Sequence, residues 1–127
     1  MTWYAAGLFL AIKLKSGNQD VFPVSENVVI VEAENFDKAR EKAIILGKNE
    51  ALSGNNLTYC GQPAFMEFLG IRKIKKTHSL DDDEIGSSQP KSGTEIIEFY
   101  FEINGENDLN NFCDGRRVQV NYVDDDE

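Results

Sequence analysis

Apolar residues recur at every second position near the start of the chain. The even positions from 4 to 14 are all apolar, and this alternation predicts a strand over residues 3–15. Its odd positions are also apolar at first, as at Trp3 and Phe9, so the first half of the strand is expected to be buried on both faces. A polar turn separates this strand from a second apolar run over residues 24–33. The two runs therefore predict a β-hairpin.

The next segment carries the period of an amphipathic helix. Its apolar stripe consists of Phe36, Ala39, Ala43 and Leu46. Asn35 suits the N-cap position, and Gly47 followed by a lysine is a typical stop, so we predict a helix between these two residues. Ile45 lies almost opposite the stripe, and we expect it to contact something other than the helix's own core.

Beyond the helix, residues 50–64 are polar and predict a loop, and residues 79–94 have the composition of a mobile acidic loop. Three further strands are predicted, over residues 65–76, 94–103 and 118–122. The pattern leaves the register of residues 65–76 open. In the strand over 94–103, the alternation places the side chains Ile97, Phe99, Phe101 and Ile103 on one apolar face.

The predicted order is ββαββ(β), which indicates a single α+β domain over residues 1–127 with a C-terminal extension at 105–127 that ends in an acidic tail. Two hairpins and one helix bury their apolar faces most simply when the main helix packs on a largely antiparallel sheet. The even positions of the first strand and the helix stripe are apolar rows of matching length. We therefore expect them to face each other.

Several short segments resemble one uncharacterised bacterial family. They are the opening Trp-Tyr-Ala-Ala at residues 3–6, the Val-Ile-Val-Glu-Ala at 29–33, and Ala39, Lys42-Ala43 and Gly47 in the helix. With residues 68–71 and 95–101, which look like its closing hairpin, they resemble domain-of-unknown-function family 4288 over residues 2–103. The resemblance implies the fold order and a bacterial cytosolic setting, and it offers no catalytic residues.

Charge is distributed unevenly along the chain. The formal net charge is −9, yet residues 1–79 hold ten Lys or Arg against eight Asp or Glu, so the acidity belongs to the last third. This balance disfavours a nucleic-acid partner. The apolar run at residues 3–12 lacks preceding basic residues and is too short to span a bilayer. We expect a cytoplasmic protein without membrane contact, in which Cys60 and Cys113 are reduced thiols.

The residues with chemical potential are few and scattered. His78, the sole histidine, would need to meet Cys60 or Cys113 in space to form a nucleophilic site, and the sequence does not bring them together. The acidic runs at residues 81–84 and 124–127 are consecutive carboxylates, which splay apart and remain hydrated rather than converge on a metal. We therefore expect no metal, no cofactor and no enzymatic activity.

Positive charge is concentrated in one cluster, formed by Arg72, Lys73, Lys75, Lys76, Arg116 and Arg117. This cluster could bind an anionic ligand such as a nucleotide, or it could neutralise the protein's own acidic loop. Surplus apolar residues indicate an interface instead, and the candidates are Trp3, Phe9, Ile45 and Tyr100.

The sequence favours a non-catalytic protein that acts by protein–protein interaction, in an immunity-like, inhibitor or adaptor role. The surplus apolar surface also predicts a two-fold homodimer, unless the C-terminal extension covers it. An anion-binding protein is the alternative, and a metal- or Cys/His-dependent hydrolase is a remote one.

Overall fold

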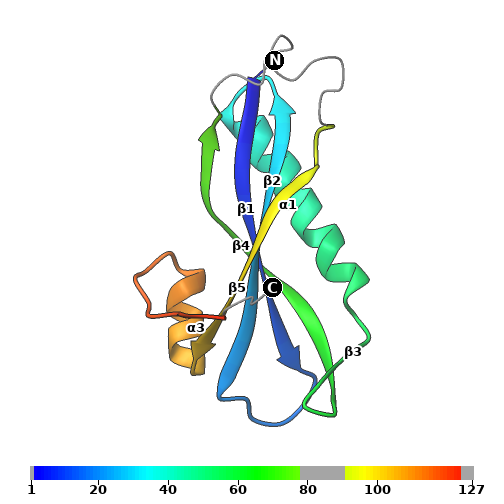
Figure 1. Cartoon of the computed structure of the whole chain (residues 1–127), viewed down its shortest axis with the longest axis vertical. Coiled ribbons are helices and arrows are strands. Elements are labelled where there is room, and N and C mark those ends of the chain that lie inside the picture. Colours follow the sequence, from blue (N-terminus) through cyan, green and yellow to red (C-terminus); the bar gives the residue numbers. More distant parts are fainter. Residues whose placement is uncertain (1, 78–90, 124–127) are drawn as a thin grey trace.

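The computed structural model describes residues 2–77 and 91–123 and has a six-stranded antiparallel sheet at its centre (Figure 1). The strands lie in the order β3-β4-β1-β2-β5-β6. Their bounds are Thr2–Leu14 for β1, Val21–Ala33 for β2, Leu57–Tyr59 for β3, Gln62–Lys76 for β4, Glu95–Asn104 for β5 and Asn121–Tyr122 for β6. Helices within the described ranges are α1 (Phe36–Ser53) and α3 (Glu106–Cys113). The predicted α+β class, with one main helix on a largely antiparallel sheet, is confirmed.

The long β1–β2 hairpin forms the middle of the sheet, with Trp3 opposite Glu32 and Ala11 opposite Val24. β4 pairs with β1 on one side, and β5 pairs with β2 on the other. The expectation that the later strands form a second hairpin with each other is therefore wrong. The actual second hairpin is β3–β4, which lies partly within the predicted loop at residues 50–64 and turns at Cys60 and Gly61, both with positive φ.

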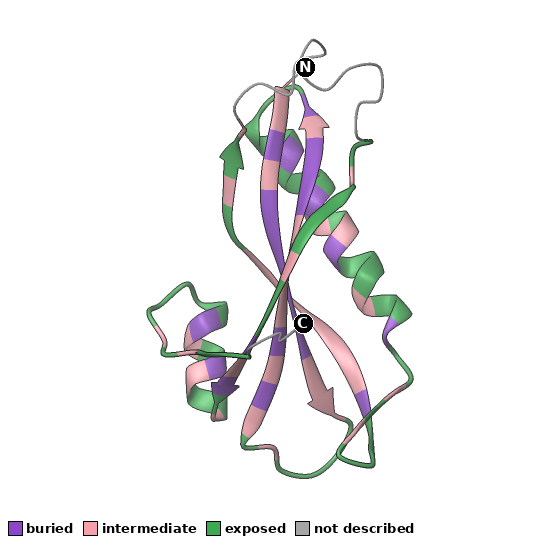
Figure 2. Ribbon diagram, in the orientation of Figure 1, coloured by how far each residue is buried: buried purple, intermediate pink, exposed green. Residues whose placement is uncertain are grey.

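Two separate cores lie on opposite faces of the sheet (Figure 2). The α1 core joins even positions of β1 to odd positions of β2 and to the helix; its buried members are Tyr4, Ala6, Leu8, Val29, Val31, Ala33, Ala39 and Ala43. The α3 core uses the other parity further along the same two strands; its buried members are Phe9, Ala11, Phe22, Val24, Phe101, Ile103, Leu109 and Phe112. Because successive side chains of a strand point to opposite faces, each helix covers only one face of one half of the sheet.

The α1 core confirms that the early even positions of β1 face the helix stripe. Phe36, the first residue of that stripe, stays largely exposed and contacts Tyr4 edge to face at a centroid distance of 6.3 Å. The α3 core corrects one expectation, because Phe9 is only 7% exposed and packs edge to face on Phe112. Phe9 is thus an anchor for α3 and not part of an exposed interface.

Two helix predictions also need correction. Asn35 is the N-cap, as expected, and its side chain accepts a hydrogen bond from the backbone N–H of Lys38. Gly47 does not end α1, which continues to Ser53. The glycine is instead buried against the Phe68 ring, where a β-carbon would overlap it. Helix α3 was not predicted, because its only buried residues, Leu109 and Phe112, are too few to show a helical period in a polar segment.

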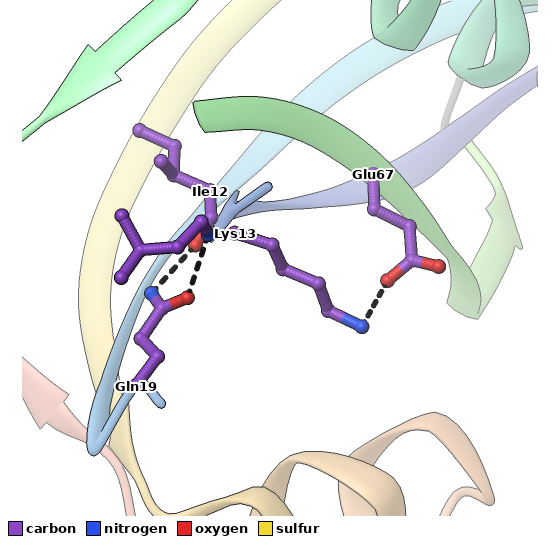
Figure 3. Close-up of polar contacts among 5 residues, drawn as sticks. Ile12, Lys13, Gln19 and Glu67 are labelled. Carbon is purple, nitrogen blue, oxygen red and sulfur yellow. Dashed lines mark hydrogen bonds and ion pairs between the residues drawn. The ribbon is translucent and has the colours of Figure 1, made fainter. Parts of the chain in front are cut away.

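The turn between β1 and β2 is fixed by one side chain. Gln19 donates to the carbonyl groups of Ile12 and Val21 and accepts from the backbone N–H of Leu14, at 2.9–3.0 Å. Beside it, Lys13 forms an ion pair with Glu67 on β4 (Figure 3). This end of the sheet is therefore held by specific polar contacts.

The close approach of α1 to β4 gives a first prediction. Gly47→Ala should lower the free energy of unfolding by about 1–2 kcal/mol, because overpacking against Phe68 outweighs the gain of about 1 kcal/mol in helix propensity. Asn49→Ala, at an exposed position of the same helix, should be neutral or slightly stabilising. Urea denaturation of both variants measures the difference, and equal stabilisation by the two changes would contradict it.

Candidate binding surface

Arg72 is the one member of the predicted basic cluster that has a clear structural role. Its guanidinium lies over the Phe112 ring at 4.4 Å from the centroid. It also donates to the carbonyl oxygens of Phe112, at 2.9 Å, and Arg116, at 3.1 Å. These carbonyls lie at and just beyond the C-terminal end of α3, where unsatisfied acceptors favour a cation. Arg72 therefore holds α3 on the sheet.

The rest of the basic cluster does not converge on one point. Lys73, Lys75 and Lys76 are exposed along the end of β4, and Arg117 is exposed in the segment after α3. Across residues 2–77 and 91–123 the ion pairs are Lys13–Glu67 and Lys38–Glu41, so none involves this cluster. The predicted neutralisation by the acidic loop would involve residues 78–90, which lie outside the described residues.

The candidate nucleophiles lack an activating environment in the described part of the chain. Cys60 and Cys113 are both exposed free thiols, and burial raises the pKa of Cys113, which disfavours the thiolate. His78 and the acidic runs at 81–84 and 124–127 lie outside the described residues. Within the described ranges no group of His, Cys, Asp and Glu could hold a metal ion, and no helix is long and apolar enough to cross a membrane.

Most of the outer edge of β5 has no partner strand among the described residues. β6 pairs with β5 only at Phe101 and Glu102, and Val123 adds a hydrogen bond from its N–H to the Tyr100 carbonyl at 3.1 Å. In the part of the chain that the structure describes, no strand pairs with the outer side of residues 95–99. We call residues 95–99 the open half of β5.

Large apolar side chains are exposed on both faces of the open half. Ile97 and Phe99 are 46% and 42% exposed, although the alternation predicted them to share a core face with Phe101. Ile96, at the register shift between β2 and β5, and Tyr100, whose neighbours along the strand point to the other face, are 55% and 45% exposed. The sequence analysis named Tyr100 as an interface candidate but missed Ile96, Ile97 and Phe99, because an edge position in a sheet leaves no mark on the hydrophobic pattern.

Acidic residues alternate with these apolar groups. Glu98 accepts a hydrogen bond of 2.5 Å from the Tyr100 hydroxyl. Partial burial, together with the neighbouring carboxylates of Glu98 and Glu50, raises the pKa of Glu95. The open half of β5 is thus an apolar surface with a negative potential.

A groove of about 350 Å³ lies next to this edge, on the face that α1 covers in the other half of the sheet. We call it the β5 groove; its lining residues are Leu10, Ile12, Pro23, Val24, Ser25, Met66, Glu98, Tyr100, Phe101, Glu102 and Val123. Its only charged members are Glu98 and Glu102. Pockets of this size with an apolar lining and a few polar groups are typical of ligand sites.

Two further hollows are less distinctive. One of about 380 Å³ lies between the β1–β2 turn and the start of α3, and its polar side chains Lys13 and Gln19 are engaged by Glu67 and the backbone. A shallower one of about 230 Å³ lies beside Ile45. Ile45 is 58% exposed, as its position on the helix predicted, and Trp3 is half-buried.

These features define a small α+β protein with one main helix on a largely antiparallel sheet, and with an apolar strand edge that no other described strand covers at residues 95–99. The model of the domain of unknown function DUF4288 matches residues 3–97, and the chain belongs to this family. No curated protein and no solved structure matches the chain. The family match confirms the resemblance and ends within β5, so α3 and β6 lie beyond it.

The Arg72 clamp gives a second prediction. Arg72→Met keeps an apolar stem but loses two hydrogen bonds and the contact with the Phe112 ring, so the free energy of unfolding should fall by about 1–3 kcal/mol. Lys75→Met, at an exposed site on the same strand, should change it by less than about 0.5 kcal/mol. Thermal unfolding of both variants compares them, and similar melting temperatures would show that Arg72 does not fix α3.

Glu26 on β2 gives a prediction about pH. It lies between Phe9 on one neighbouring strand and Phe99 on the other, and burial raises its pKa above 4.5. A carboxyl whose pKa is raised in the folded state destabilises the fold when ionised, and the penalty disappears as pH falls below the unfolded value. Glu26→Gln should therefore raise the melting temperature at pH 7.

The gain in melting temperature that Glu26→Gln gives at pH 7 should vanish when the pH falls to or below 4.5, the ordinary pKa of a glutamate. Melting curves collected from acidic to neutral pH measure this dependence. Glu34→Gln, which neutralises an exposed carboxylate, serves as the control and should show no comparable gain. An advantage of Glu26→Gln that grows on acidification would have the wrong sign and would refute the assignment.

Proposed function

We propose that the protein is non-catalytic and acts by binding a protein partner through the open half of β5. The observation that carries the proposal is the exposure of Ile96, Ile97 and Phe99 on a strand edge that no described strand covers. Such an edge is a template for an added strand, because its outward N–H and C=O groups are available for pairing.

The opposite edge of the sheet supports this interpretation by contrast. Beyond the short β3 pairing, the outer edge of β4 carries Lys73, Lys75 and Lys76, and its register with β1 shifts at two points. Lysines and bulges are devices that prevent strands from adding to an edge. In the corresponding place, β5 has exposed apolar side chains, and this pattern is expected of an edge that pairs with a partner strand.

The charge of β5 indicates which kind of partner would bind it. The edge strand carries Glu95, Glu98 and Glu102, and the whole chain has a net charge of −9. A segment that alternates apolar and basic residues would pair its side chains with both kinds of group along β5. A second copy would bring glutamates against glutamates when Glu98 pairs with itself, so we favour a different, basic partner over a homodimer.

An acidic binder of this kind fits an immunity-like, inhibitor or adaptor role, in which carboxylates speed association with a basic target. We place the protein in the bacterial cytoplasm, in line with the family resemblance. The anion-binding alternative is less well supported, because the donors of Arg72 are engaged by the carbonyls near the end of α3.

A peptide titration tests the proposal. An eight-residue peptide of alternating lysine and valine should shift the backbone amide NMR signals of residues 95–99 in ¹⁵N-labelled protein. The same peptide with alternate amides N-methylated cannot pair as a strand, and a glutamate–valine peptide has the wrong charge. Neither should produce these shifts.

The matched variants are two pairs of lysine substitutions, each of which removes two exposed apolar side chains. Ile97→Lys with Phe99→Lys should abolish binding of the lysine–valine peptide, whereas Ile45→Lys with Leu52→Lys on α1 should leave it unchanged. Equal binding of the N-methylated peptide would exclude strand addition. No shift at residues 95–99 with millimolar peptide would exclude the edge as a contact surface.

A further inference from the structure

The β5 groove has an apolar floor for a simple geometric reason. Leu10 and Ile12 lie at even positions of β1, on the face that α1 covers beside Tyr4 and Leu8. α1 packs on the part of this face that holds Tyr4 and Leu8, and α3 packs on the opposite face (Figure 1). Neither helix core includes Leu10 or Ile12, although Leu10 is only 2% exposed. Met66 closes the side of the groove nearest to β3.

The polar atoms around the groove are rich in hydrogen-bond acceptors. Glu102 lies opposite Pro23 and Glu98 opposite Asn27, so both carboxylates project from the face that forms the groove. Asn27 is only 6% exposed, and its side-chain oxygen Oδ1 has no hydrogen-bond partner among the described residues. Asn27 lies directly opposite Glu98 on the neighbouring strand, but it is not one of the residues that line the groove.

The two carboxylates of Glu98 and Glu102 favour a cationic donor, and among the described residues no Lys or Arg lines the groove. A ligand that complements both features has an aliphatic body for the floor and a positively charged N–H donor for the rim. We propose that the β5 groove binds a small amphipathic cation, namely an aliphatic chain with a primary ammonium group. This site shares Glu98 with the open half of β5, but it does not rest on the proposed function.

The strand pairing favours a free small molecule over a side chain of a bound strand. At the level of the groove, the outer edge of β5 is already occupied, because Phe101 and Glu102 pair with Tyr122 and Asn121 of β6. Val123 continues along this edge and lines the groove itself. A partner strand can therefore add only beyond this level. A volume of about 350 Å³ is near the lower limit for small-ligand sites, which suits a short alkyl chain.

The experiment uses octylammonium as the probe and the full chain with labelled methyl groups. Titration should shift the methyl signals of Leu10, Ile12 and Met66 and saturate as a single site. Octanol, which keeps the chain without the charge, should bind more weakly, and octanoate, which reverses the charge, should not bind.

Paired substitutions test whether the carboxylates of the groove bind the ammonium group. Glu98→Gln with Glu102→Gln should weaken octylammonium binding roughly tenfold, because each change removes a charged acceptor. Glu34→Gln with Glu41→Gln removes the same charge from exposed positions outside the groove and should leave the affinity unchanged.

Three results would overturn the proposal. The first is equal binding of octanoate and octylammonium, and the second is an unchanged affinity after the Glu98→Gln and Glu102→Gln pair. The third is a lysine–valine peptide that shifts the three methyl signals at lower concentration than octylammonium does, since a peptide would then be the occupant. The Ile97→Lys and Phe99→Lys pair should retain octylammonium binding, so the groove and the open edge can fail independently.

Discussion

The constraint on which this structure depends is the use of one long hairpin to support two cores on opposite faces. β1 and β2 each have 13 residues, more than either helix covers. Even positions of β1 pack under α1 at one end, and Phe9 and Ala11 pack under α3 at the other. Successive residues of a strand point to opposite faces of the sheet, so both cores are built on the same backbone of β1 and β2.

The same arrangement explains where the candidate sites lie. Each helix covers one face of one half of the sheet, and neither helix core extends to the remaining half-faces. One of these half-faces holds the β5 groove, which Leu10 and Ile12 line. Among the described strands, only β6 pairs with the outer edge of β5, at Phe101 and Glu102. Both candidate sites therefore follow from incomplete coverage of the sheet, and both carry negative charge from glutamates of β5.

The family match ends at residue 97, yet the structure beyond it is an integral part of the fold. Helix α3 covers Phe9 and Phe101, and Arg72, which lies inside the matched region, donates to two carbonyls of the α3 segment. The polar extension after β5 is therefore a second helical cover. Ile45 and Tyr100 are exposed and belong to neither core. This agrees with the side of the helix or strand on which the sequence placed each of them.

The sequence by itself determined the elements with strong periodicity: the alternation at residues 4–14, the Asn35 cap and the stripe beginning at Phe36 specify the hairpin, the helix and the α+β class. Only the tertiary structure decided which strands pair, because pairing of β4 with β1 and β5 with β2 is a long-range choice that local patterns do not encode. It also decided that Gly47 is a packing residue and that Arg72 is a clamp. The exposure of Ile97 and Phe99 could not be predicted for the same physical reason: an apolar side chain looks alike in a sequence whether a neighbouring strand covers it or solvent does.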